Sequence, residues 1–111
     1  MTAPLTGRPR LKVPASAALD EVIEIRTLLD HPMETGLRKG PDGQPIPRDM
    51  LASFVAQANG ESFVRVDFRN ASSAHPHLVF FARISGPTDF NFIWTHEDGR
   101  TLSAAARVEV T

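Results

Sequence analysis

The side chains most able to do chemistry in this sequence are the four histidines, His31, His75, His77 and His96. Neutral imidazole is a common metal ligand, so the His75-x-His77 pair could supply part of a cation site. Two ligands do not complete such a site, and the chain has no cysteine that could add a thiolate. We interpret the histidines as surface or turn residues and expect no metal. A small metal-binding protein using His75, His77 and Met33 is kept as an alternative.

Candidate catalytic groups are sparse. Ser72, Ser73 and His75 lie close together in the sequence, but they lack the nucleophile, base and orienting group of a hydrolase. The neighbours Glu97 and Asp98 fall in a predicted turn, where carboxylates commonly bond the backbone. No glycine-rich stretch has the spacing of a phosphate-binding loop. The sequence therefore predicts no catalytic residue, no cofactor and no enzyme that acts alone.

Charge and hydropathy exclude two further classes of protein. The 12 basic and 13 acidic residues give a formal net charge of −1 without a long basic run, so we expect no nucleic-acid partner. No stretch approaches the roughly 18 apolar residues that cross a bilayer, so we expect no membrane association either. The first residues lack the apolar segment of a secretory signal, which taken alone predicts a cytoplasmic protein.

Short apolar runs separated by Gly, Pro, Asn and Asp indicate an all-β domain. Residues 21–29 alternate with a period of two, which places Ile23, Ile25, Thr27 and Leu29 on one face of a half-buried strand. The same alternation predicts further strands over residues 61–69, 78–84, 90–95 and 101–110, with a short first strand at 11–13.

Residues 50–58 are harder to assign, because Leu51, Phe54 and Ala58 would also suit one face of a helix. The Asn59-Gly60 pair that follows is a strong hairpin signal, since both positions tolerate positive φ. We therefore predict two strands joined by a tight turn.

About seven short strands in roughly 100 residues favour an immunoglobulin-like β-sandwich with one long ordered loop. Trp94 is expected to pack between the two sheets. Phe80 and Phe81 are adjacent on a strand, so one should enter the core while the other faces outward as an interface anchor, unless both are covered within the domain. We expect a flexible N-terminal arm over residues 1–9 and one sandwich domain over residues 10–111.

The long connection at residues 31–48 has a distinctive order of residues: His31-Pro32-Met33-Glu34-Thr35-Gly36, then Arg38, Gly43 and Ile46-Pro47-Arg48. This order closely resembles the signature loop of the SoxZ family, the small subunits of the SoxYZ carrier in bacterial thiosulfate oxidation. The resemblance spans about residues 10–110.

Further matching positions are LKVPASA, Asn59-Gly60 before Phe63 and Asp67, and Phe92-x-Trp94 before Asp98-Gly99. One departure is His75-Pro76-His77, where the family pattern has Asn-Pro-Tyr.

The resemblance implies an immunoglobulin-like sandwich that forms a heterodimer with SoxY and makes transient contacts with other Sox enzymes. In that family SoxY carries sulfur intermediates on a cysteine of a flexible C-terminal arm, and SoxZ supplies no catalytic residue. The lack of cysteine in this chain fits that division of roles. The family works in the periplasm, which implies that the folded chain is exported together with SoxY and without a signal of its own.

We hypothesise that the long loop is a recognition surface, with Met33 as an adaptable apolar contact and Arg38 or Arg48 as a charged one. The full set of predicted partner-binding residues is His31, Met33, Glu34, Arg38, Arg48 and Phe81. The alternative is that the loop prolines only stiffen a connection. We also expect that the isolated chain could pair with itself through an exposed apolar area or strand edge. The rival function is a generic immunoglobulin-like binding module with another partner.

Overall fold

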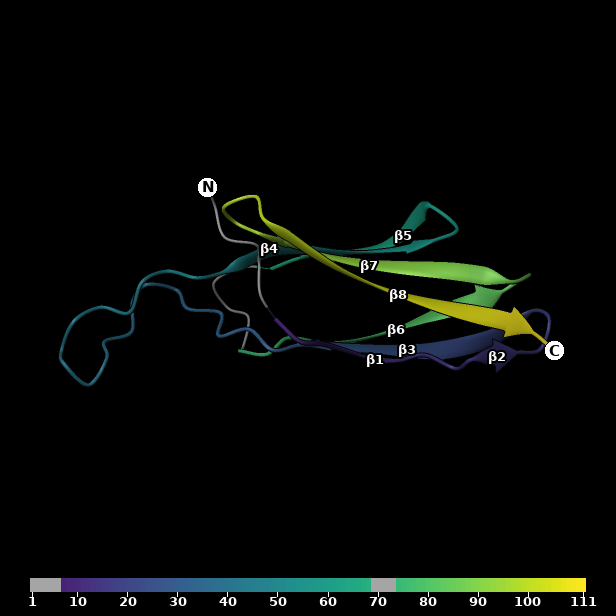
Figure 1. Ribbon diagram of the computed structural model, residues 1–111, viewed down its shortest axis with the longest axis horizontal. Coiled ribbons are helices and arrows are strands. Elements are labelled where there is room, and N and C mark those ends of the chain that lie inside the picture. Colours follow the sequence, from purple (N-terminus) through teal and green to yellow (C-terminus); the bar gives the residue numbers. More distant parts are fainter. Residues whose placement is uncertain (1–6, 69–73) are drawn as a thin grey trace.

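The computed structural model describes residues 7–68 and 74–111, and eight β-strands lie within them (Figure 1). They are β1 (Pro9–Lys12), β2 (Ser16–Ala17), β3 (Glu21–Leu29), β4 (Leu51–Ala58), β5 (Glu61–Asp67), β6 (His77–Ile84), β7 (Thr88–His96) and β8 (Thr101–Val110). The two sheets have the strand orders β1-β3-β6 and β2-β8-β7-β4-β5. This arrangement confirms the predicted β-sandwich.

The strand that the sequence did not predict is β2. It is two residues long and runs parallel to β8, whereas the other strand pairs are antiparallel. Two residues are too few to show an alternating pattern, so no periodicity could reveal this strand.

The predicted alternation along the longer strands is confirmed. In β3, Ile23, Ile25, Thr27 and Leu29 are all buried, while the residues between them face outward or are only partly covered. Apolar side chains on one face of each strand meet those of the opposite sheet, because burying them removes apolar area from water. The core is therefore the space between the two sheets.

The helix-like pattern in β4 has a structural cause. The register of β4 against β7 shifts between Leu51 and Ser53, which leaves one extra residue on β4. A β-bulge of this kind changes which side chains point inward. The inward positions accordingly switch from odd to even, from Leu51 to Phe54 and Ala56.

The hairpin between β4 and β5 forms as predicted. Asn59 and Gly60 both have positive φ, at 50° and 85°, as the tight turn of a two-residue hairpin requires. A second register shift follows in the same hairpin, and it leaves Phe63 as the extra residue on β5. The ring of Phe63 lies 5.9 Å from both Phe80 and Phe90, where it covers the side of the sandwich between β5 and β6.

Aromatic rings fill the centre of the sandwich, as expected for Trp94. Trp94 is fully buried and its ring centroid lies 5.1 Å from that of Phe54. Phe80 packs against Phe54 and Phe92, whereas its neighbour Phe81 is 60% exposed. The prediction that these adjacent side chains take opposite faces is confirmed.

Some predicted features lie outside the described residues: the N-terminal arm up to residue 6, the end of the 61–69 strand at Arg69, and Ser72 and Ser73. Of the predicted N-terminal arm, residues 7–9 are described, and Pro9 is already the first residue of strand β1. Within residues 7–68 and 74–111, no helix is long and apolar enough to cross a membrane.

Candidate functional site

The long loop between β3 and β4 is ordered and folds back on itself. The backbones of Glu34 and Asp49 pair through two hydrogen bonds of 2.8 Å, and the amide of Ile46 donates to the carbonyl of Arg38 at 2.8 Å. We call residues 34–49 the arm. In Figure 1 this segment projects beyond the end of the sandwich. It is therefore a loop whose two sides are joined by isolated backbone bridges, at Glu34–Asp49 and Lys39–Pro45.

One glycine is required where the two sides of the arm approach each other. Gly36 has a φ of 87°, and a Cβ atom at this position would lie 3.3 Å from Cβ of Arg48. Side chains rarely adopt this backbone conformation, and the space beside Gly36 is already filled. The glycine therefore lets the two sides of the arm lie close together at its base.

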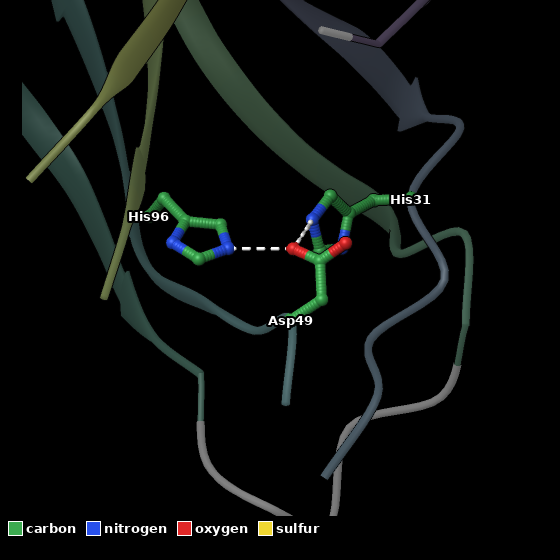
Figure 2. Close-up of side chains that lie close together, drawn as sticks. All are labelled: His31, Asp49 and His96. Atoms are coloured by element: carbon green, nitrogen blue, oxygen red, sulfur yellow. Dashed lines mark hydrogen bonds and ion pairs between the residues drawn. The ribbon is translucent and has the colours of Figure 1, made fainter. Parts of the chain in front are cut away.

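Three polar side chains from separate parts of the chain meet beneath the arm (Figure 2). His31 follows β3, Asp49 precedes β4, and His96 is the last residue of β7. The Nε2 atoms of His31 and His96 lie 3.1 and 2.6 Å from Oδ1 of Asp49. Both histidines are buried, while the side chain of Asp49 is 43% exposed. We call these residues the His–Asp–His clamp, since they join both sheets to the base of the arm.

The backbone fixes the proton position in the ring of His31. Its Nδ1 atom accepts a hydrogen bond from the amide of Met33 at 3.1 Å, so the neutral ring carries its proton on Nε2 and donates it to Asp49. In His96, Nδ1 likewise accepts the amide of Asp98 at 3.1 Å. One carboxylate oxygen thus accepts two imidazole protons, and neither buried ring leaves a nitrogen unpaired.

The environment favours a neutral His31 beside an ionised Asp49. Burial lowers the pKa of His31 below its ordinary value; the charge of Asp49 opposes this shift without reversing it, and His96 adds to it. Burial alone would raise the pKa of Asp49, but the hydrogen bond from His96 and the interactions with His31 together lower it. Asp49 is therefore a hydrogen-bond acceptor at neutral pH.

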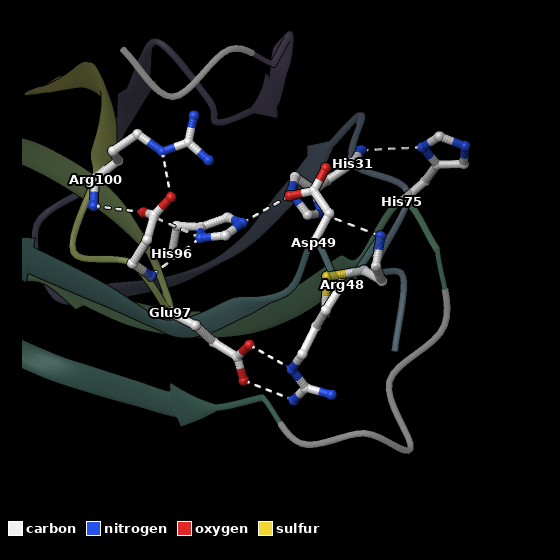
Figure 3. A network of polar contacts seen from close by, with 9 residues as sticks. His31, Arg48, Asp49, His75, His96, Glu97 and Arg100 are labelled. Atoms are coloured by element: carbon white, nitrogen blue, oxygen red, sulfur yellow. Dashed lines mark hydrogen bonds and ion pairs between the residues drawn. The ribbon is translucent and has the colours of Figure 1, made fainter. Parts of the chain in front are cut away.

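An ion pair at the surface and a further histidine extend this network (Figure 3). Arg48 donates two hydrogen bonds of 2.8 Å to the carboxylate of Glu97 and one of 2.9 Å to the carbonyl of Thr35. The amide of His31 donates to Nδ1 of His75 at 3.1 Å, and the amide of His75 donates to the carbonyl of His31 at 2.7 Å. The base of the arm is thus attached to the β7–β8 turn and to the chain preceding β6.

His31, Asp49 and His96 are also the described residues that could hold a metal ion, because their ligand atoms lie within 4.8 Å of one another. A histidine bound to metal through Nε2 carries its proton on Nδ1 and donates it to an acceptor. Asp98 offers such an acceptor to His96 at 3.1 Å. At His31, however, Nδ1 faces the N–H of Met33. A metal bound at Nε2 would move the ring proton to Nδ1, where it would point at the N–H of Met33 and leave two donors facing each other. The hydrogen bonding therefore favours a clamp over a metal site.

The prediction that the four histidines are surface or turn residues is correct for two of them and wrong for the other two. His75 and His77 are exposed, but His31 and His96 are buried at 3% and 7% exposure. Burial is tolerated because every ring nitrogen of the two buried histidines has a hydrogen-bond partner. The alternative metal site of His75, His77 and Met33 does not form at the surface, because Met33 lies in the core while both histidines are exposed.

The predicted partner-binding residues divide into three groups. His31 and Met33 are buried within this chain, and Met33 adopts an uncommon φ of 52°. The charged residues are engaged within the arm or at its base: Glu34 pairs with Arg38, and Arg48 pairs with Glu97. Phe81 is exposed on β6. Whether any of the six contacts a partner stays a prediction.

Sequence reasoning missed Asp49 and His96 as parts of the site, and it also missed Leu37, which is 84% exposed on the arm. A signal for the histidines was present. His31 continues the buried odd-numbered stripe of β3 by one step, and His96 continues the even-numbered stripe of Phe90, Phe92 and Trp94. Both therefore point to the inner side of the sandwich at its end.

The fold and the site together define an immunoglobulin-like β-sandwich in which the most reactive side chains hold a projecting arm in place. The family model of the sulphur oxidation protein SoxZ matches residues 11–107, and the chain belongs to this family. Membership implies a role in Sox sulfur oxidation and association with SoxY. No curated protein matches the chain.

Solved structures with the same fold include a superoxide reductase and a sulfur carrier. Superoxide reductase (neelaredoxin) from Ignicoccus hospitalis has a TM-score of 0.74 at 15% identity, covering 95% of this chain and 82% of that one. A variant of the same reductase gives 0.74 at 16% identity, covering 96% and 82%. The sulfur carrier SoxY from Chlorobium limicola f thiosulfatophilum gives 0.65 at 10% identity, covering 92% and 74%. At these identities the likeness shows the fold alone.

Proposed function

We propose that this chain is a non-catalytic subunit that forms a heterodimer with SoxY and supports the SoxY cysteine arm on which sulfur intermediates are carried. The observation that carries this proposal is the His–Asp–His clamp. His31, Asp49 and His96 are the best candidates for chemistry in the described chain, yet they bond to one another and to the backbone. Groups held in this way stabilise the arm of residues 34–49 of this chain and are not poised to react with a substrate.

The absence of cysteine supports the same division of roles. A covalently attached sulfur intermediate requires a thiolate, and this chain has none. The carrier cysteine must therefore belong to the partner. The contribution of this chain is to bind that partner and to present it to the other enzymes of thiosulfate oxidation.

The arm is the part of the chain that extends farthest from the sandwich (Figure 1). Its outer part exposes Leu37 and Lys39, while its base is held by the clamp and by the Arg48–Glu97 pair. A rigid support reduces the conformational entropy that a recognition element loses on binding. We assign transient recognition of SoxY or a visiting Sox enzyme to this outer part, in place of the buried Met33.

The proposed location is the periplasm, reached by co-transport with SoxY. Co-transport of a folded chain requires that the heterodimer form before export and survive it. A complex of this kind needs a stable interface, of standard size or larger.

Size-exclusion chromatography with light scattering tests the proposal on the chain alone and mixed with its cognate SoxY. We expect a 1:1 complex that survives dilution to micromolar concentration. The chain alone would show any self-association through its strand edges as a concentration-dependent mass. Separate elution of the two proteins would contradict the proposed function.

A further inference from the structure

The outer face of the three-stranded sheet β1-β3-β6 is a second exposed surface, distinct from the arm. The strand register places its side chains in rows, with Val22 opposite Arg83, Glu24 opposite Phe81, and Arg26 between Val79 and Lys12. Residues directly opposite one another in neighbouring strands share a face of the sheet. We call this surface the outer face.

The outer face carries three of the large apolar side chains that remain exposed in the described chain. Val22 is 52% exposed, Val79 46% and Phe81 60%. Phe81 and Val79 follow each other on the same side of β6, and Val22 lies on the neighbouring strand β3. Exposed apolar groups that gather on one face mark an interaction site more often than scattered ones do.

The same face is basic although the chain as a whole is slightly acidic. Arg10, Lys12, Arg26 and Arg83 lie on the outer face with the carboxylate of Glu24, and Asp30 lies at its margin beside Arg10, which leaves a surplus of two positive charges (four minus two). The whole chain has a formal net charge of −1. Arg26 pairs with Glu24, and Arg10 lies 3.8 Å from Asp30.

Two of these cations are available for a partner. Among the described residues, no carboxylate lies within ion-pair distance of Lys12 or Arg83. They stand at opposite corners of the face, one on β1 and one on β6. An acidic surface would gain interactions with both without first breaking an ion pair.

The face continues around the free edge of β6 into a groove. This groove of about 580 Å³ is lined by Phe63, Phe81, Phe90 and Arg83, among others. β6 pairs only with β3 among the described strands, so its other edge has no neighbouring strand. An aromatic anchor beside a groove and an open strand edge is a suitable centre for a protein interface.

The charges indicate which occupant fits. A second copy of this chain docked face to face would bring two surpluses of positive charge together, and like charges across an interface are unfavourable. Nucleic acid would use the cations but would gain little from three exposed aliphatic and aromatic groups between them. A protein surface with carboxylates around an apolar centre would satisfy both features.

We propose that the outer face, centred on Phe81, is the docking surface for an acidic, partly apolar face of the SoxY subunit. This inference rests on the proposed function, because it assumes that SoxY is the partner. It assigns the stable heterodimer contact to the sheet and leaves the outer part of the arm for transient contacts.

Calorimetric titration with cognate SoxY at two salt concentrations tests the assignment. We expect Phe81→Ser to raise Kd about 30-fold, as for an anchor residue at the centre of an interface. Arg83→Glu should raise Kd about tenfold at low salt and less at high salt, because salt screens exposed charges. The matched control is Arg65→Glu, on the outer side of the larger sheet, which should bind like the wild type. Leu37→Ser is the contrasting variant, since it tests whether the arm carries any of the stable contact.

The outcomes separate the two proposals. If the wild type binds SoxY and Phe81→Ser and Arg83→Glu bind equally well, the docking surface is wrong while the proposed function stands. If Leu37→Ser weakens binding and Phe81→Ser does not, the stable contact belongs to the arm. If the wild type does not bind SoxY, both proposals are wrong. Binding of duplex DNA at physiological salt that is lost in Arg83→Glu would assign the face to nucleic acid and overturn the inference.

Discussion

The base of the arm and the outer face of the β1-β3-β6 sheet use their side chains in opposite ways. At the base, His31, Asp49 and His96 form hydrogen bonds within the chain. On the outer face, Phe81 is exposed and Arg83 has no ion-pair partner among the described residues. The polar groups of the first region are paired within the chain, whereas the second leaves an aromatic ring and a cation exposed. The residues that resemble a recognition motif therefore serve the architecture, while a less distinctive stretch of β6 is available for binding.

This difference predicts that a change at the base lowers stability and a change on the outer face lowers affinity. The largest effect on stability is expected for Asp49→Ala. It leaves the Nε2 protons of two buried histidines without an acceptor, which should lower the free energy of unfolding by about 2–4 kcal/mol. Urea unfolding followed by tryptophan fluorescence measures this, with the exposed Asp67→Ala as control. Equal stability of the two variants would mean that the clamp does not hold the arm.

A pH titration of stability should show the clamp without any mutation. The folded state lowers the pKa of His31 from its ordinary value of 6.5, so the unfolded chain binds a proton more readily. Stability from this group is complete above pH 6.5 and is lost as the pH falls toward the lowered folded pKa. Protonation of Asp49, whose ordinary pKa of 3.8 is also lowered in the fold, adds a further loss at lower pH.

The control for this titration is His31→Gln, since a glutamine amide can still donate to Asp49 but does not titrate. Urea midpoints between pH 7 and pH 5 should fall less steeply in this variant than in the wild type. Parallel slopes for the two proteins would show that His31 is not the titrating group.

How far the sequence predicts the molecule depends on whether a feature is local. Strand β3 follows from alternation, and the β4–β5 turn follows from Asn59-Gly60, because each requires only neighbouring residues. The clamp joins positions that are 18 and 47 residues from Asp49, so no spacing motif reveals it. Continuing the alternation of β3 and β7 by one step would have placed His31 and His96 on the inner side, although we interpreted them as surface or turn residues. The bulge between Leu51 and Ser53 breaks the alternation and could not be anticipated from it.

Arg48→Ala should have a smaller effect than Asp49→Ala. It removes the paired hydrogen bonds to Glu97 and the bond to the Thr35 carbonyl, but both charged side chains are partly exposed, at 42% and 38%. We expect a small loss of stability, and a smaller one in high salt, because solvent and ions screen an exposed pair. Thermal unfolding at two salt concentrations measures it. A loss as large as that of Asp49→Ala would place the main support of the arm at the surface.

Phe81→Ser should hardly change the stability of the isolated chain, within about 0.5 kcal/mol, because an exposed side chain contributes little to folding. Thermal unfolding of the chain without SoxY measures this, with Phe80→Ser as the contrasting variant. Phe80 packs against two core aromatic rings, and its replacement should be strongly destabilising. A large loss for Phe81→Ser would show that this side chain belongs to the core.

The smallest expected effect is that of metal ions. Excess Zn²⁺ should leave the Tm of the chain unchanged. Zinc bound to Nε2 of His31 would place the ring proton on Nδ1, where it would face the N–H of Met33 instead of accepting from it. A concentration-dependent rise in Tm that is absent in His96→Ala would instead identify the three residues as a cation site.

Hydrogen exchange of the chain, free and bound to SoxY, tests the central contrast most directly. The amides of Glu34 and Asp49 are already bonded at the base of the arm, so peptides from this region should be protected in both states. Peptides from β6 should gain protection only in the complex, as SoxY covers the outer face and the open strand edge. Protection gained at the base of the arm with β6 unchanged would contradict the account.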